Sequence, residues 1–330
     1  MAESKKEKSY LIWMLKIIAT IMVIYIHSAN IFGYSNTTIP DYLRPFSLLS
    51  NTGVPLFMLI SGYLFFRREV DWKENLRKKV KRLAIPFLIW SGFWILFEFA
   101  GYLIFPSRFE NVLGWNLADF LYNWIGIPFT AGPLYGPLWY VRDLFIISIF
   151  APFVQRLIRK YPIAFFILAV VFWFVPINRM FRQTVVLFVI GGVFSIQSDW
   201  IEAFKRIDYK IGFITLSAAI AASFVKIDCM YQLTIFLYTA TAFLICNGLL
   251  HNKHVKSVCK YLAAYVFIIY VLHGKPLSIM QILYTSLLTG KGWVLLGYFI
   301  LPLICFFAFL GVAIVFKKYL PRAYKICTGE

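Results

Sequence analysis

Ten apolar stretches divide this chain, and most of them are long enough to cross a lipid bilayer as a helix. A hydrocarbon core of about 30 Å needs roughly 20 residues of helix. With 61% hydrophobic and only 15% charged residues, the composition excludes an ordinary soluble domain. We therefore predict an all-α polytopic integral membrane protein with about ten transmembrane helices. These cover residues 10–31, 46–66, 83–105, 134–157, 161–178, 184–198, 211–226, 231–250, 261–283 and 293–316.

The distribution of basic residues predicts the orientation in the membrane. If the "SKKEK" start lies in the cytoplasm, the inside segments hold 24 of the 33 Lys and Arg residues. That bias is typical of cytoplasmic loops, so both termini are predicted to be cytoplasmic, in a multi-pass protein of the plasma membrane. The formal net charge of +18 is then explained by topology, and nucleic acid is not an expected partner.

The connections between the apolar stretches are short, so residues 1–330 are predicted to form a single transmembrane domain without a separate soluble domain. The first apolar stretch is full length and lacks a small-residue cleavage site, so we expect it to be retained. The five cysteines have no pairing or ligand spacing, and His251 and His254 have no further ligand nearby in the sequence. We therefore predict neither a disulfide framework nor a metal site.

The first predicted helix carries two ionisable residues on one face. Lys16 and His27 are 11 residues apart, about three helical turns, so they project from the same side roughly 16 Å apart along the axis. An ionisable side chain that faces acyl chains costs several kcal/mol, which favours a face directed into the bundle. Each residue also has a simpler explanation, because Lys16 can reach the inner headgroups and His27 can be a hydrogen-bonded packing residue.

More ionisable residues occur at similar predicted depth in other helices. Arg142 and Asp143 lie in the fourth helix, His273 and Lys275 in the ninth, and Glu98 in the outer half of the third. Their combination indicates an aqueous pocket that opens outward. The alternative for Arg142 and Asp143 is a buried ion pair that fixes helix packing. Trp139 and Tyr140 belong to an aromatic cluster with Trp115, Trp124 and Tyr135, which either stacks on sugar rings or forms an interfacial belt.

The stretch "NTGVPLFMLISGYLFFRRE" resembles the second-helix signature of the acyltransferase 3 family of membrane-bound acyltransferases. The matching positions run from Gly53 to Phe57 and from Ser61 to Leu64. In the family's first helix an arginine and a histidine are separated by ten residues, and here Lys16 and His27 keep that gap, with lysine replacing arginine. "RKKVKRLAIP", "GPLWYVRDLF" and "YVFIIYVLHGKP" resemble later family segments in the same order.

The resemblance implies transfer of an acyl group, acetyl or succinyl, from cytoplasmic acyl-CoA to a hydroxyl or amine of an envelope glycan or a lipid-linked sugar. It implies that His27 is the general base, since a histidine can take a proton from the acceptor hydroxyl. Lys16 and the basic run Lys78, Lys79, Lys81 and Arg82 are then candidates to hold the phosphates of CoA, and acetyl-CoA is the expected co-substrate. The basic run can equally be an inner-leaflet anchor.

The remaining polar residues are given roles around that reaction. Arg142 and Lys275 are candidates to stabilise the oxyanion, and His273 is a candidate to orient the acceptor. Glu98 and Asp143 are candidates to set the tautomer of His27, and with Trp139, Tyr140 and Lys275 they are predicted to line the substrate pocket. The alternative function is a transporter of an envelope glycan or small solute, with His27, Arg142 and His273 along its pathway.

Overall fold

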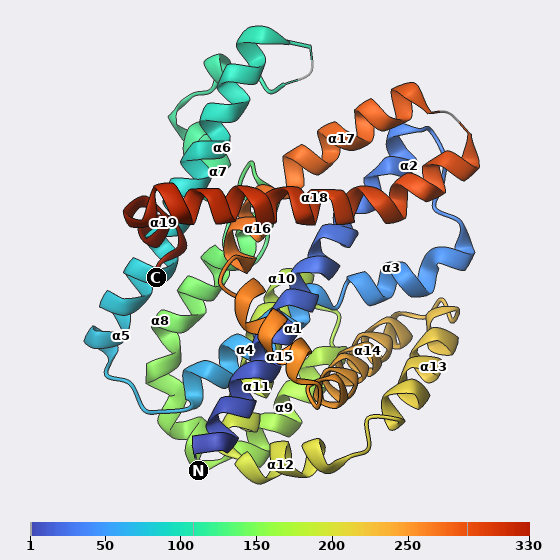
Figure 1. The fold of residues 1–330 in the computed structure, drawn as a ribbon. Coiled ribbons are helices and arrows are strands. Elements are labelled where there is room, and N and C mark those ends of the chain that lie inside the picture. The colour runs from blue at the N-terminus through green and yellow to red at the C-terminus, as the bar shows by residue number, and fades with distance from the viewer. Residues whose placement is uncertain (1, 108, 289) are drawn as a thin grey trace.

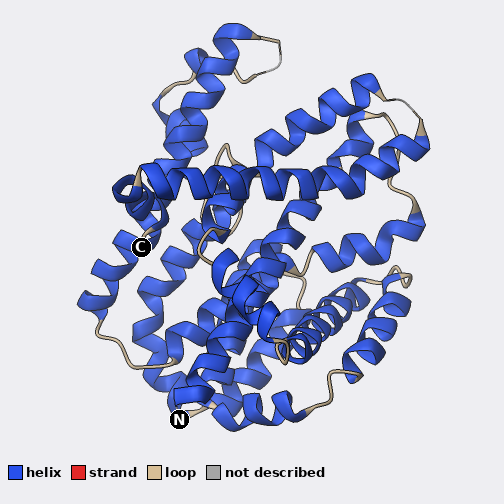
Figure 2. Ribbon diagram, viewed as in Figure 1, coloured by secondary structure: helices blue, strands red, loops and turns tan. Residues whose placement is uncertain are grey.

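The protein is built of helices connected by short loops (Figure 2). The computed structural model describes residues 2–107, 109–288 and 290–330, without the side chains of residues 2–8 and 228. The N-terminal lysines of the predicted topology are among those side chains. Within the described residues the only strand-like pairing is an isolated bridge between Ile127 and Ala131. The all-α prediction is therefore confirmed.

Helices of the first half of the chain are α1 (Ala2–Ser28), α2 (Asn30–Tyr34), α3 (Arg44–Ser50), α4 (Gly53–Phe66), α5 (Trp72–Lys79), α6 (Ile85–Ile104), α7 (Leu117–Ile125) and α8 (Trp139–Lys160). Those of the second half are α9 (Pro162–Phe174), α10 (Arg179–Phe181), α11 (Leu187–Ile196), α12 (Ser198–Arg206), α13 (Ile211–Ser223), α14 (Asp228–Leu249), α15 (Lys253–Leu262), α16 (Val266–Leu272), α17 (Gly274–Leu287), α18 (Lys291–Tyr319) and α19 (Pro321–Thr328). Short 3₁₀ turns cover Asp41–Leu43 (η1), Val112–Gly114 (η3) and Gly136–Leu138 (η4), and π-helical turns cover Val80–Ala84 (η2) and Arg182–Val186 (η5).

The number of membrane spans differs from the ten that the sequence predicts. Six helices of the described residues are long and apolar enough to cross a bilayer, and two bent pairs raise the number to eight. One of these pairs joins Gly136–Lys160 to Pro162–Phe174 through a bend of 116°. Helix α13, at 13 residues, is too short to span alone. The multi-pass character is confirmed, whereas the count of ten is not.

The ninth predicted helix, residues 261–283, is not continuous. The chain bends by 54° between α15 and α16, and it is interrupted again at His273, between α16 and α17. Pro276 lies just beyond the second interruption and has no amide hydrogen to continue the ladder of helix hydrogen bonds. Apolar length alone predicted one helix where the structure has three segments.

Helix α1 is the central element of the fold. It runs through the middle of the molecule and is crossed near its end by α18 (Figure 1). It packs against α4 and against the later helices α14–α18. Buried residues of α1, among them Leu15, Ala19 and Val23, belong to the main hydrophobic core. A side chain on α1 can therefore meet residues from the end of the chain.

Helices α4 and α11 approach each other at backbone distance. A Cβ added at Gly62 would lie 2.0 Å from the carbonyl oxygen of Phe188, and one at Gly191 would lie 2.1 Å from that of Leu59. Only glycine fits at such a crossing, and small residues are typical of contacts between membrane helices. Gly53, at the start of α4, is similarly close to the backbone of Ala19 on α1. The glycines of the second-helix signature thus fix α4 between α1 and α11.

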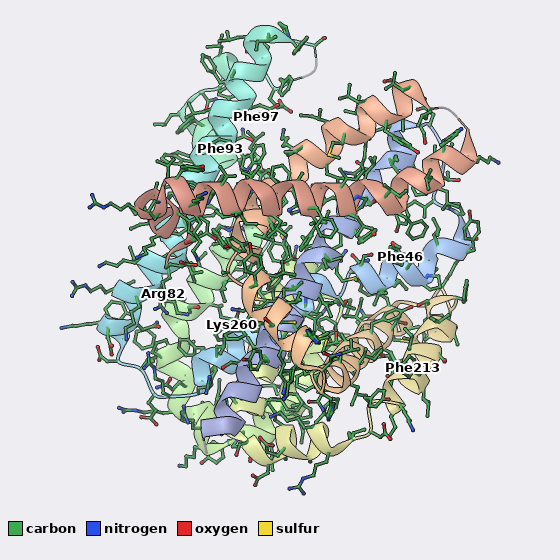
Figure 3. All side chains as sticks on the ribbon, in the orientation of Figure 1. Phe46, Arg82, Phe93, Phe97, Phe213 and Lys260 are labelled. Carbon is green, nitrogen blue, oxygen red and sulfur yellow. The ribbon has the colours of Figure 1, made fainter. Side chains whose placement is uncertain are left out.

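The outside of the bundle carries many large apolar side chains. Phe93 on α6 and Phe213 on α13 are 43% and 55% exposed, and both are labelled in Figure 3. Exposed apolar residues of this size are normal on a surface covered by lipid. The ionisable residues that the sequence singles out are mostly withdrawn from this surface.

Candidate functional site

His27 and His273 meet in the interior although they come from opposite ends of the chain. The centroids of their imidazole rings are 5.2 Å apart, with the ring planes inclined by 48°. His27 is half-buried in the last turn of α1, and His273 is 0% exposed at the break between α16 and α17. The structure therefore brings two of the predicted catalytic residues into one site.

The end of α1 is held in place by side-chain hydrogen bonds to later helices. The Gln281 amide of α17 donates to the carbonyl of Ser28 at 3.0 Å and to that of His27 at 3.3 Å. Ser28 Oγ and the Tyr25 hydroxyl donate to carbonyl groups of α18. Because the last carbonyls of a helix have no partner within it, the Gln281 amide satisfies those of α1, and the bonds from Tyr25 and Ser28 to α18 fix the same backbone that carries His27.

The helix break positions the His273 ring. His273 Nδ1 lies 2.6 Å from the carbonyl oxygen of Tyr270, an acceptor, so Nδ1 carries the hydrogen and Nε2 carries a lone pair. Nε2 is buried and has no hydrogen-bond partner in the described part of the protein. The amide of Gly274 donates to the hydroxyl of Tyr135 at 2.7 Å. A buried acceptor without a partner is unusual, which marks Nε2 as a place where a ligand donor can bind.

Two stacked aromatic residues support this break. The rings of Trp94 on α6 and Tyr135 are parallel to within 6°, with centroids 4.4 Å apart. The Trp94 indole donates to the carbonyl of Val271 at 3.0 Å, and the Tyr135 ring is edge-on to His273. Offset stacking stabilises such a pair beyond the area it buries. Both residues were missed as site residues: Tyr135 was visible only as one of a cluster of aromatics, and nothing in the sequence singles out Trp94.

Glu98 and Lys275 form an ion pair beside the same break. Glu98 Oε2 lies 2.6 Å from Lys275 Nζ, and Glu98 Oε1 accepts from the amide of Glu110 at 2.9 Å. Glu98 is 2% exposed, and the Lys275 side chain is 30% exposed. The sequence predicted both as substrate-binding residues. The structure places them together, on α6 and α17, where they join the helix of Trp94 to the segment that follows His273.

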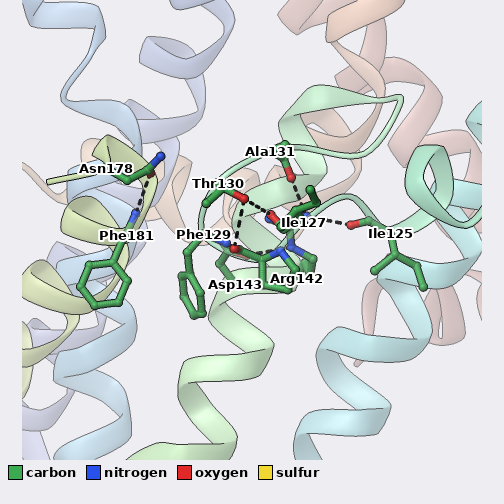
Figure 4. A network of polar contacts seen from close by, with 10 residues as sticks. Ile125, Ile127, Phe129, Thr130, Ala131, Arg142, Asp143, Asn178 and Phe181 are labelled. Carbon is green, nitrogen blue, oxygen red and sulfur yellow. Dashed lines mark hydrogen bonds and ion pairs between the residues drawn. The ribbon is translucent and has the colours of Figure 1, made fainter. Parts of the chain in front are cut away.

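Arg142 and Asp143 bind a loop (Figure 4). Arg142 Nε lies 2.8 Å from Asp143 Oδ1, and its Nη1 donates to the carbonyls of Ile125 and Ala131, each at 2.8 Å. The Asp143 carboxylate also accepts from the amide of Phe129. These contacts match the structural alternative for Arg142 and Asp143, a buried ion pair that fixes packing. No contact joins Arg142 or Asp143 to His27 or His273 within the described residues.

The basic candidates lie apart from the histidines along two helices. Lys16 is half-buried on α1, three turns before His27, and no partner for its ammonium occurs within the described part of the chain. Lys78 pairs with Glu74, and Lys79 lies 5.4 Å from the centre of the Phe65 ring. Lys81 and Arg82 are exposed in η2, and Figure 3 shows Arg82 on the same helix as Phe93. π-helical turns occur frequently at functional sites.

The remaining aromatic candidates are divided between the core and its edge. Tyr140 is buried, and its hydroxyl lies 3.1 Å from Ser61 Oγ of the second-helix signature. Trp139 is half-buried against the core. Tyr140 and Tyr270 contact each other and Phe57 through their rings, one residue layer from His273. The structure therefore connects Tyr140 to the histidine site, and it leaves Trp139 at the periphery.

The comparisons with known proteins agree with this picture. The family described as an acyltransferase domain matches residues 11–318. The chain is also 29% identical over 162 residues to succinoglycan biosynthesis protein ExoH of Rhizobium meliloti (strain 1021), a match that covers 45% of this chain and 42% of the relative. The chain thus matches about two fifths of that relative's length. No solved structure matches it significantly. Because the family match extends over nearly the whole chain and includes both histidines, the protein belongs to the acyltransferase-domain family.

Proposed function

We propose that this protein transfers a short acyl group, acetyl or succinyl, from cytoplasmic acyl-CoA to a hydroxyl or amine of an envelope glycan or lipid-linked sugar at the plasma membrane. His27 is the general base of this reaction. The observation that carries the proposal is the contact of His27 and His273, with ring centroids 5.2 Å apart, beside a buried imidazole lone pair of His273 that no group of the described residues satisfies. Family membership supplies the reaction class.

The chemistry follows from a neutral imidazole. His27 removes the proton from the acceptor hydroxyl while the hydroxyl oxygen attacks the carbonyl carbon of the thioester. This attack forms a tetrahedral intermediate with a negatively charged oxygen. Collapse of the intermediate breaks the C–S bond, and the imidazolium returns its proton to the departing CoA thiolate. General-base catalysis of this kind contributes about 10² to 10⁴ in rate.

The donor side is assigned to basic residues. Lys16 shares the face of α1 with His27, and Lys78, Lys79, Lys81 and Arg82 lie near the start of the helix that continues into α6. Their positive charge is suited to the phosphates of CoA. The exposed pair Lys81 and Arg82 is the best candidate, because the other lysines of this run already contact Glu74 or Phe65.

The acceptor is inferred from the relative. ExoH takes part in succinoglycan biosynthesis by its name, and succinoglycan is a polysaccharide. A glycan hydroxyl is a fitting acceptor for a histidine base, and the half-buried aromatic Trp139 and buried Tyr140 are suited to contact a sugar ring. In this proposal Glu98 and Lys275 fix the segment that follows His273, and Asp143 holds the loop at residues 125–131.

The test uses the full chain in nanodiscs with a panel of short acyl-CoAs, and it follows the free CoA thiol with and without envelope extract as acceptor. His27→Gln is compared with His254→Gln, because His254 is an exposed histidine of a loop-proximal helix and serves as a matched control. We expect thiol release to fall at least 100-fold in His27→Gln and to remain in His254→Gln.

Folded wild-type protein that neither binds nor cleaves any acyl-CoA, even with the acceptor extract, would contradict the transferase. The next experiment would then be uptake or export of labelled glycan in vesicles. Equal thiol release by wild type and His27→Gln would instead keep the enzyme and remove His27 as its base.

A further inference from the structure

We propose that the stacked pair Trp94 and Tyr135 holds the helix break at His273 open, and so fixes the His273 tautomer that presents an unprotonated Nε2 to the acceptor. Tyr135 is then a positioning residue that acts through His273. This inference rests on the proposed acyl transfer for its catalytic consequence, whereas its structural part stands on the hydrogen bonds around the break.

The break at His273 replaces a hydrogen bond that a continuous helix would make. In an unbroken helix the amide of Gly274 would donate to the carbonyl of Tyr270, four residues earlier. Here that amide donates to the hydroxyl of Tyr135 instead, at 2.7 Å. The Tyr270 carbonyl is thereby free, and it accepts from His273 Nδ1 at 2.6 Å. The phenol of Tyr135 has replaced a backbone acceptor.

The freed carbonyl of Tyr270 selects the tautomer of His273. A neutral imidazole carries one hydrogen, on either Nδ1 or Nε2. Because Nδ1 faces a carbonyl oxygen, which can only accept, the hydrogen is placed on Nδ1. Nε2 is left as a buried acceptor with no partner in the described residues. A second hydroxyl of the glycan acceptor, next to the reacting one, supplies the missing donor, so the reacting hydroxyl keeps its hydrogen for His27.

Trp94 and Tyr135 together keep the break in place. Tyr135 is 2% exposed and lies against Trp94 with nearly parallel rings. Trp94 in turn donates to the carbonyl of Val271. Trp94 thus binds α16, before the break, and Tyr135 binds α17, after it. Pro276 removes a further amide from the ladder and favours the same interruption.

Substitution of Tyr135 by phenylalanine keeps the stack and removes the hydroxyl. Without that acceptor, the Gly274 amide competes with His273 Nδ1 for the Tyr270 carbonyl, so the preference for the Nδ1–H tautomer is weakened. Tyr238→Phe is the matched control, because Tyr238 is also buried and its hydroxyl lies 3.0 Å from Ser223 Oγ on neighbouring α13.

The experiment measures the tautomer and the reaction separately. Nitrogen NMR of histidine-labelled full-length protein in nanodiscs, assigned by difference from His273→Gln, is expected to show a protonated Nδ1 and an unprotonated Nε2 at His273. In Tyr135→Phe we expect a mixture of tautomers and about a tenfold loss of acceptor-dependent transfer, with unchanged acceptor-independent CoA release. Tyr238→Phe should match wild type in both measurements.

Three results would overturn the inference. They are a protonated Nε2 at His273 in wild type, an unchanged tautomer in folded Tyr135→Phe, and an equal loss of transfer and of acceptor-independent release. Failure of the acyl-transfer proposal looks different, because it removes CoA release from wild type while the NMR result at His273 remains intact.

Discussion

The close crossing of α4 and α11 gives a sharp prediction for Gly62→Ala. The new methyl group would lie 2.0 Å from the Phe188 carbonyl oxygen and 2.8 Å from its carbon, and both are backbone atoms that no rotamer change can move away. To restore ordinary contact, the two helices must separate by more than about 1 Å along their closest seam. Overpacking of this kind costs about 1–3 kcal/mol, occasionally more.

Gly92→Ala is the matched control, because Gly92 also lies in an apolar helix and an added Cβ there meets nothing within 4 Å. The assay is thermal unfolding of each variant in the same detergent, followed by the loss of monodisperse protein on size exclusion. With an unfolding entropy of about 2.1 cal/mol/K per residue, a cost of about 2 kcal/mol lowers the midpoint of this 330-residue chain by roughly 3 °C. If Gly62→Ala unfolded at the same temperature as Gly92→Ala, the backbone contact between α4 and α11 would be refuted.

Three further predictions concern the ionisable residues. Lys275→Met should destabilise the protein by about 1–3 kcal/mol because it leaves Glu98 buried without its cation. Adding Glu98→Gln should recover part of that loss in thermal unfolding. Equal losses of stability in the single and double variants would contradict the pairing. Arg142→Lys, which cannot hold two loop carbonyls and a carboxylate at once, should speed proteolysis of the loop at residues 125–131 several-fold, and an unchanged cleavage rate would argue against the clamp. Lys81→Ala with Arg82→Ala should raise the KM for acyl-CoA about tenfold with little change in kcat, and an unchanged KM would place the donor phosphates elsewhere.

Much of the fold was predictable because apolar length and periodicity report directly on membrane helices. The face shared by Lys16 and His27 was also predictable, since it needs only one helix, and the structure has that helix as α1. The break at His273 was not predicted, because it depends on an acceptor from Tyr135, more than a hundred residues away in the sequence.

The site was predictable in its residues but not in their partners. His27 and His273 were both candidates, yet their contact depends on the packing of α1 against α16 and α17. Glu98 and Lys275 were assigned separate roles, although they form one ion pair. Arg142 and Asp143 were assigned both a catalytic and a structural role, and only the contacts with the loop at residues 125–131 reveal what they hold. Such pairings depend on three-dimensional proximity, which a single sequence does not record.

The helix from Trp72 to Ile104 has one further consequence. It runs without interruption through α5, η2 and α6, so Arg82 near its start and Trp94 beyond its middle belong to one rod. Twelve residues of helix separate them, about 18 Å along the axis. In the proposed reaction this helix sets the distance between the residues that bind the donor's phosphates and the two histidines. A donor can react only if the linker between its phosphates and its thioester spans that distance, so the helix selects donors by the length of this linker.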